Sequence, residues 1–241
     1  MGVSLRYILL ALTLAAAEPG GAVAETPAGD AGLADAAIVE RLRFIEERLD
    51  ASRLHGQVWY WSWMAINGGS TVGLGIAAGL SRHEDDQVNN GVQAGVAAIG
   101  VADLLFRPLE ARLGAAPIEG LPEATHAEKL AKLRAAEAQL RANAERAEER
   151  TSWLMHAANV GLNGAAGGII ALAGRPSDGL IAFATGTAGG TINILTQPWA
   201  PATDWQDYKA RFGGDANRER LWLAVTPLPD RGAMLALHYQ W

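Results

Sequence analysis

The sequence predicts a mainly α-helical protein: a tandem pair of helical hairpins forming a four-helix bundle with a coiled stalk, plus a C-terminal β-hairpin. Three observations predict this fold class. Two charged segments repeat apolar residues at spacings of three and four, which is the period of an amphipathic helix. Each leads into a glycine-rich stretch without Asp, Glu, Lys or Arg, then a short turn and another uncharged stretch. Near the end of the chain the period changes to two, which is typical of strands.

Residues 1–24 have the features of a secretory signal peptide. A weakly basic start at Arg6 precedes an apolar run over 7–17, and a small-x-small pattern over 22–24 suits a signal peptidase. We expect cleavage after this pattern, followed by a linker over 25–32. The alternative, an uncleaved anchor, is disfavoured because the apolar run is short for a membrane span. We therefore expect an exported protein of the bacterial cell envelope, either membrane-associated or periplasmic.

Composition and charge narrow the classes of function. The chain has 241 residues, a net charge of −6 and no cysteine. An acidic exported protein is a poor candidate for nucleic-acid binding, because phosphate contacts need clustered Lys and Arg. Without cysteine there is no disulfide scaffold, thiolate zinc site or cysteine-linked lipid anchor. The GxSxG, HExxH and GxxxxGK[ST] motifs are also missing, so we expect no enzyme, no cofactor and no bound metal.

The first hairpin is expected over residues 33–113. Its apolar seam has charged residues on the other faces and consists of Ile38, Leu42, Ile45 and Leu49. No proline follows, so we expect a single helix of roughly 70 Å that continues to about Leu80. A charged turn over 81–87 and an uncharged return helix over 87–102 complete the hairpin before a stretch rich in Pro and Gly.

The second hairpin is expected over 122–199 and repeats the first after roughly 95 residues. A charged helix over 123–150 has its own seam, with Glu137 as the polar exception: Leu130, Leu133, Leu140, Ala144, Ala147 and Leu154. Because no helix breaker follows, we expect this helix to run on to Gly174. A turn over 175–179 and a return helix over 180–196 follow.

The remainder divides into a polar and aromatic connector over 200–220 and a β-hairpin over 221–241. Apolar residues alternate on both sides of a turn that contains Pro and Gly: Leu221, Leu223 and Val225, then Ala233, Leu235, Leu237 and Tyr239. An isolated hairpin is marginally stable in water, so we expect it to pack on the helices or on another chain.

Glycines inside the uncharged helices are expected to serve close helix packing. Each costs about 1 kcal/mol relative to alanine in a helix interior, so its presence there needs a reason. Four pairs have the small-xxx-small spacing that lets backbones approach: Gly75 and Gly79, Gly91 and Gly95, Gly164 and Gly168, Gly186 and Gly190. In composition and spacing these segments resemble the glycine-zipper hairpins of some bacterial envelope proteins.

Five polar residues inside the uncharged stretches are candidates for burial: Asn67, Asp103, His156, Asn163 and Asn193. Such groups either join helices by hydrogen bonds, which we favour, or line a cavity. His156 and Asn163 share one helical face with Asn159. Asp103 either pairs with Arg107 one turn later or faces a polar interior together with Asn67. The acidic residues of the first turn, near His83, could bind a cation, but a solvated turn is the expected state.

Two hypotheses about function remain open. In the first, this is a non-enzymatic envelope protein whose Gly-rich hairpins are embedded in a membrane, as a scaffold or a small oligomeric pore. Tryptophans at the ends of the uncharged stretches favour it: Trp59, Trp61, Trp63, Trp153 and Trp199. In the second, it is a soluble periplasmic bundle that binds a partner through its stalk or C-terminal hairpin, which suits the Asn- and Thr-rich helices better. The expected partners are further copies of the chain or another envelope protein.

Overall fold

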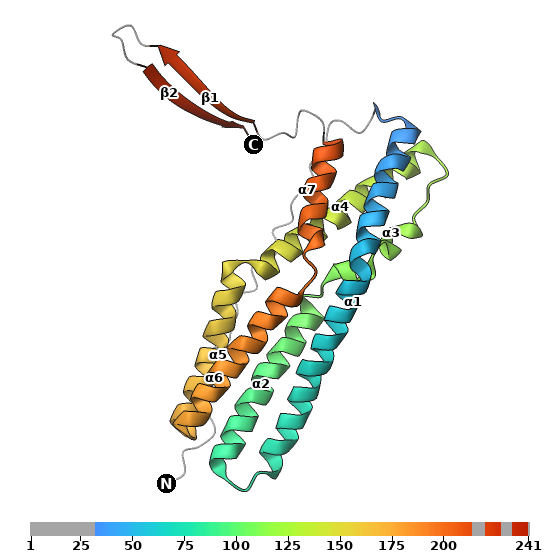
Figure 1. The fold of residues 1–241 in the computed structure, drawn as a ribbon. Helices are drawn as coiled ribbons and strands as arrows, with labels where there is room; N and C mark the ends of the chain where they lie inside the picture. Colours follow the sequence, from blue (N-terminus) through green and yellow to red (C-terminus); the bar gives the residue numbers. More distant parts are fainter. Residues whose placement is uncertain (1–31, 214–219, 228–232, 241) are drawn as a thin grey trace. The chain divides into compact units, whose positions relative to one another are not determined.

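The computed structural model describes residues 32–213, 220–227 and 233–240, so the predicted signal peptide and nearly all of the linker lie outside the described residues. Every helix and strand described below lies in one compact unit, Ala34–Trp241. This unit is mainly α-helical, as predicted (Figure 1).

The elements follow one another with short connections. In chain order they are α1 (Asp35–Leu80), α2 (Glu84–Phe106), the 3-10 helix η3 (Glu110–Leu113), α3 (Ala116–Glu119), α4 (His126–Thr151), α5 (Trp153–Ala173), α6 (Pro176–Thr196), α7 (Ala200–Phe212), β1 (Arg220–Pro227) and β2 (Ala233–Gln240). β1 and β2 pair antiparallel, with Leu223 opposite Leu237. α1 packs along α2, α5 packs along α6, and α2 also contacts α5.

α1 is one unbroken helix of 46 residues, as the seam and the lack of proline predicted. All four seam residues from Ile38 to Leu49 are buried. Their partners are α4 and α7, whose contributions to the same core include Leu133, Leu140 and Tyr208. We call this part of the unit the base: residues 35–57 of α1 together with η3, α3, α4 and α7.

The prediction that the second long helix continues to Gly174 is wrong. α4 ends at Thr151, Ser152 has extended backbone angles, and α5 begins at Trp153. The Ser152 hydroxyl accepts a hydrogen bond from the Met155 amide at 3.4 Å, which is the role of a helix N-cap. Because the helical period stops there, Leu154 leaves the seam and is 60% exposed, contrary to its predicted burial.

Both turns between paired helices are shorter than predicted. Glu84, Asp85 and Asp86 form the first turn of α2, where carboxylates interact favourably with the helix dipole. α6 likewise begins at Pro176, which suits a first helical position because proline has no amide hydrogen to leave unbonded. Arg175 joins the two turns by ion pairs to Asp86, and to Asp85 at 3.9 Å.

α7 is held in the base by a buried polar contact as well as by apolar packing. The Tyr208 hydroxyl donates a hydrogen bond to Glu137, the polar exception in the α4 seam, and Arg41 of α1 lies 3.8 Å from the same carboxylate. Burial and this hydrogen bond raise the pKa of Tyr208, so the phenol stays protonated. Glu137 therefore helps to hold α7 against α4. Its place in an apolar seam did not predict this role.

Candidate functional site

Asparagines of α5 fit into glycine positions of α6. The Asn159 amide donates to the Thr187 carbonyl oxygen at 3.0 Å and to the Thr191 hydroxyl at 3.3 Å. Asn163 is buried, and its amide donates to the carbonyl and side-chain oxygens of Asn159, both at 2.9 Å. A Cβ at Gly186 would overlap the Asn163 amide, and one at Gly190 would overlap the Asn159 amide. These glycines make room for a polar ladder between the two helices.

The first pair of helices contains a similar contact. A Cβ at Gly100 of α2 would lie 2.9 Å from the Asn67 side chain of α1. The Asn67 carbonyl also accepts a hydrogen bond from the Thr71 hydroxyl at 2.8 Å. Asparagine opposite glycine is thus a feature shared by both pairs. Gly100 and Asn159 are not among the residues predicted for packing or burial, but they could have been found by asking which glycines face an asparagine across a hairpin.

The eight predicted packing glycines fall into distinct groups. Gly186 and Gly190 are in tight contact, whereas Gly91 and Gly164 have only ordinary contacts near 3.8–3.9 Å. Within this chain, nothing described lies within 4 Å of a Cβ placed at the remaining four, which are Gly75, Gly79, Gly95 and Gly168. The spacing therefore does not by itself identify the glycines at the contact between paired helices.

The backbones of α5 and α6 also approach each other closely at two other glycines. A Cβ at Gly167 would lie 2.6 Å from the Gly179 carbonyl oxygen, and one at Gly179 would overlap the Gly167 carbonyl oxygen and lie 2.7 Å from Ala171. Both glycines are buried. Gly167 lies on α5 and Gly179 lies on α6, twelve positions later in the sequence. Because the two glycines are on different helices, no spacing motif within one helix could have paired them.

Asp103 lies in a charged junction where α2 meets the base. It pairs with Arg107 at 3.5 Å, as predicted, and also with Arg150 of α4 at 3.0 Å. Arg150 is 4% exposed and its guanidinium carbon lies 5.0 Å from the Trp59 ring centre. Burial lowers the pKa of Arg150, and the Asp103 charge opposes that shift. Arg150 is not among the residues predicted from the sequence, because it lies near the end of a helix rich in exposed arginines.

The other two polar candidates take no part in the asparagine ladder. His156 is half-buried, and in the described part of the chain its ring makes no hydrogen bond. Asn193 contributes through its backbone: its carbonyl oxygen accepts a hydrogen bond from the Trp59 indole at 3.1 Å. Among the described residues, no group of three or more His, Asp or Glu side chains is placed to hold a metal ion.

Exposed aromatic residues gather at the level of this junction. Four of them, here called the aromatic collar, are more than half exposed: Trp61, Phe106, Trp153 and Trp199. Contacts place their helices together, since Trp63 donates to the Thr196 hydroxyl at 3.4 Å and Leu104 packs with Trp59. The collar thus marks the level at which the uncharged stretches of α1, α2, α5 and α6 meet the base.

Beyond the collar the outer surface of the helices is apolar. We call this part the apolar region: 58–80, 87–106, 153–173 and 179–199, with Asp103 as its only Asp, Glu, Lys or Arg. Of the described residues, all large apolar side chains that are exposed lie here, apart from Val39 and Leu54. Its buried positions include the small or polar Asn163, Ala166 and Gly167 as well as the apolar Ile170 and Ile194. The base differs from it on the outer surface, which carries most of the charged side chains.

Comparisons with known proteins returned nothing: no family model, curated protein or solved structure matches the chain. Among the described residues, none of the helices combines the length and apolar character needed to cross a membrane.

Proposed function

We propose that this is a non-enzymatic bacterial envelope protein whose apolar region is embedded in a membrane, while its base lies in water and acts as a scaffold. The observation that carries the proposal is the outward apolar face of α1 beyond the collar, where large apolar side chains are exposed. On α1, Ile38 and Ile45 are fully buried in the base, whereas Val72 and Ile76 of the apolar region are 61% and 57% exposed.

The exposed apolar surface of this region must be shielded from water by a membrane or by another protein. Fully burying one large aliphatic side chain is worth about 1.5–3 kcal/mol, and monomers in water rarely expose extended apolar patches. Asn159 and Asn163, two of the polar side chains inside the apolar region, are meanwhile hydrogen-bonded between or within helices. Asn, Gly and Thr on the contacting faces lower the mean hydropathy of each helix. The proposal therefore rests on the outward faces of the packed helices.

Length and aromatic placement agree with this arrangement. From Trp61 to Leu80 a helix rises by about 29 Å, close to the thickness of a bilayer's hydrocarbon core. Trp and Tyr favour the boundary between membrane and water, which is where the aromatic collar would lie. The finer architecture belongs to the same proposal: two helical hairpins form a four-helix bundle on a coiled stalk, and the C-terminal hairpin packs on the helices or on a second chain.

Two matched valines on α1 test the proposal. Val72→Asp places a charge at the middle of the apolar region, where insertion would cost about 3 kcal/mol, equivalent to about a hundredfold in partitioning. Val39→Asp makes the same change at a position of the base that is 52% exposed. We expect the wild type and Val39→Asp to stay in carbonate-washed membranes and Val72→Asp to appear in the extract. Equal release of all three proteins would refute membrane embedding.

The second candidate function is a periplasmic interaction protein whose apolar region is covered by another protein. Gly75, Gly79, Gly95 and Gly168 favour it, because each leaves open space at which a helix of another chain could approach closely. A monodisperse soluble oligomer, broken by Val72→Asp and retained by Val39→Asp, would support this alternative over the first.

A further inference from the structure

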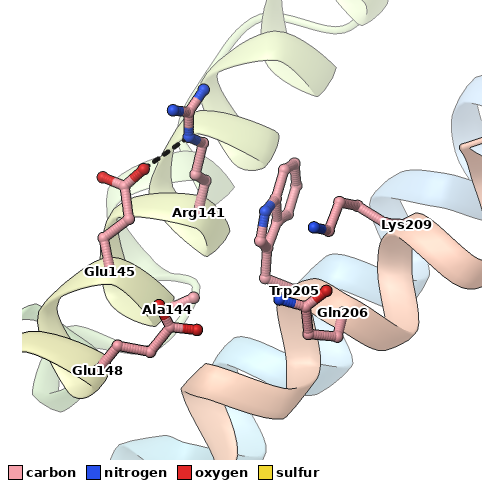
Figure 2. Close-up of a pocket in the computed structure, with 7 residues that line it drawn as sticks. All are labelled: Arg141, Ala144, Glu145, Glu148, Trp205, Gln206 and Lys209. Atoms are coloured by element: carbon pink, nitrogen blue, oxygen red, sulfur yellow. Dashed lines mark hydrogen bonds and ion pairs between the residues drawn. The ribbon is translucent and has the colours of Figure 1, made fainter. Parts of the chain in front are cut away.

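A pocket of about 410 Å³ lies in the base between α4 and α7 (Figure 2). α4 contributes Arg141, Ala144, Glu145 and Glu148, and α7 contributes Trp205, Gln206 and Lys209. The pocket is separate from the asparagine ladder and from the charged junction.

Two opposite charges in this pocket have no partner. Among the described residues, neither the Lys209 amino group nor the Glu148 carboxylate takes part in an ion pair or a hydrogen bond, whereas Arg141 binds Glu145 at 2.7 Å. Figure 2 shows the Lys209 amino group directed toward the Trp205 indole. That indole is held from behind by Tyr208, whose ring stacks on it at 5.6 Å between centroids. A free cation, a free carboxylate and a fixed aromatic ring therefore face one cavity.

The pocket lies a short distance from the aromatic collar. Trp205 of α7 is six positions after Trp199, the N-cap of that helix, which corresponds to about 9 Å along the helix. Glu148 is five positions before Trp153, in the last turn of α4 before the break at Ser152. The headgroup layer adds about 5–8 Å to each side of the hydrocarbon core. If the collar marks the edge of that core, the pocket opens at about the depth of the lipid headgroups.

We propose that this pocket binds the zwitterionic headgroup of a phospholipid of the phosphoethanolamine type, an inference that rests on the membrane placement proposed above. The phosphate lies against Lys209 and the remaining N–H groups of Arg141, and the ammonium donates to Glu148 beside the Trp205 ring. A primary ammonium fits better than a quaternary one, because it can donate to a carboxylate. A quaternary ammonium is instead typically held by a cage of several aromatic rings.

The first arm of the test uses a soluble probe. The mature chain is titrated with O-phosphoethanolamine in a detergent free of zwitterionic headgroups, and binding is followed by calorimetry. We expect Lys209→Gln and Glu148→Gln each to weaken binding by at least about tenfold. Arg43→Gln, which removes a charge from an exposed pair on α1, should bind as the wild type does. Inorganic phosphate and ethanolamine should each bind more weakly than the whole headgroup.

The second arm uses flotation with vesicles of phosphatidylglycerol, with or without phosphatidylethanolamine. A preference for the mixed vesicles that Lys209→Gln abolishes would support a lipid ligand. Flotation of both proteins without any preference would overturn the inference and leave the membrane proposal intact. If neither protein floats, the membrane proposal fails, and phosphoethanolamine binding in the first arm would then identify a soluble phosphate ester in place of a lipid.

Discussion

Two adjacent glycines of α5 should respond in opposite ways to the same substitution. Gly167 faces α6, where an added Cβ would lie 2.6 Å from the Gly179 carbonyl oxygen and 2.9 Å from the Phe183 Cβ. Gly168 is the next residue, and no described atom lies within 4 Å of a Cβ placed there. Because both lie inside the same helix, Gly→Ala at either position brings a similar gain in helix propensity.

This matched pair isolates the steric cost of the contact. Gly→Ala in a helix interior gains about 1 kcal/mol, which Gly168→Ala should show as added stability. At Gly167 the atoms in the way include backbone, so α5 and α6 must move apart, at a cost typical of overpacking, about 1–3 kcal/mol. The propensity gains cancel in the comparison, and the two free energies of unfolding should differ by that steric cost.

The assay is denaturant unfolding of both variants and the wild type in one detergent, followed by circular dichroism. Gly167→Ala should have the lowest midpoint and Gly168→Ala the highest, with the same slope. Equal gains in stability at the two positions would refute the close backbone contact between α5 and α6. If both variants lose stability, Gly168 instead has a partner outside this chain, and the loss at Gly168 should then depend on protein concentration.

Three further predictions follow from contacts in the base, in the apolar region and at the junction between them. Gly186→Ala should cost about 1–2 kcal/mol by displacing the buried Asn163 amide, and in a double-mutant cycle Asn163→Ala should remove most of that cost. Arg150→Met should destabilise by about 3 kcal/mol in thermal unfolding, because it leaves a partly buried acid short of one partner; an unchanged midpoint would contradict the ion pair. A hydrogen bond from His126 lowers the pKa of the Asp35 carboxyl below its usual 3.8. Asp35 thus adds stability above that pH and loses it as pH falls through the lowered value, so Asp35→Asn should flatten the acid side of the pH–stability profile.

Helices were predictable wherever the local pattern was decisive. The seam from Ile38 to Leu49 combines one apolar stripe with charges on all other faces, and no breaker follows before Leu80. The break at Ser152 was not predictable in this way, because serine is compatible with both a helix interior and an N-cap. Which role it takes depends on packing, because α4 packs against α1 and α7 before this point and α5 packs against α6 after it.

The packing glycines show a second limit. Small-xxx-small spacing places two residues on one helical face but does not say which face meets the neighbour. Gly164 and Gly168 have this spacing, and so do Asn163 and Gly167, one residue and about 100° of rotation away. The structure turns Asn163 and Gly167 toward α6. The choice depends on the partner helix, whose own glycines at 179 and 186 accept that face, so no single segment contains the answer.

The two halves of the chain join the base to the apolar region differently. α1 passes the boundary as one helix, which fixes its buried seam and its exposed apolar face in a single register. In the other half the extended Ser152 separates α4 from α5, so no continuous helix holds the two parts in alignment there. Arg150 lies beside this break, buried against Trp59 of α1 and paired with Asp103 of α2. The buried cation thus ties the interrupted half to the continuous one at the level where the outer surface changes from charged to apolar.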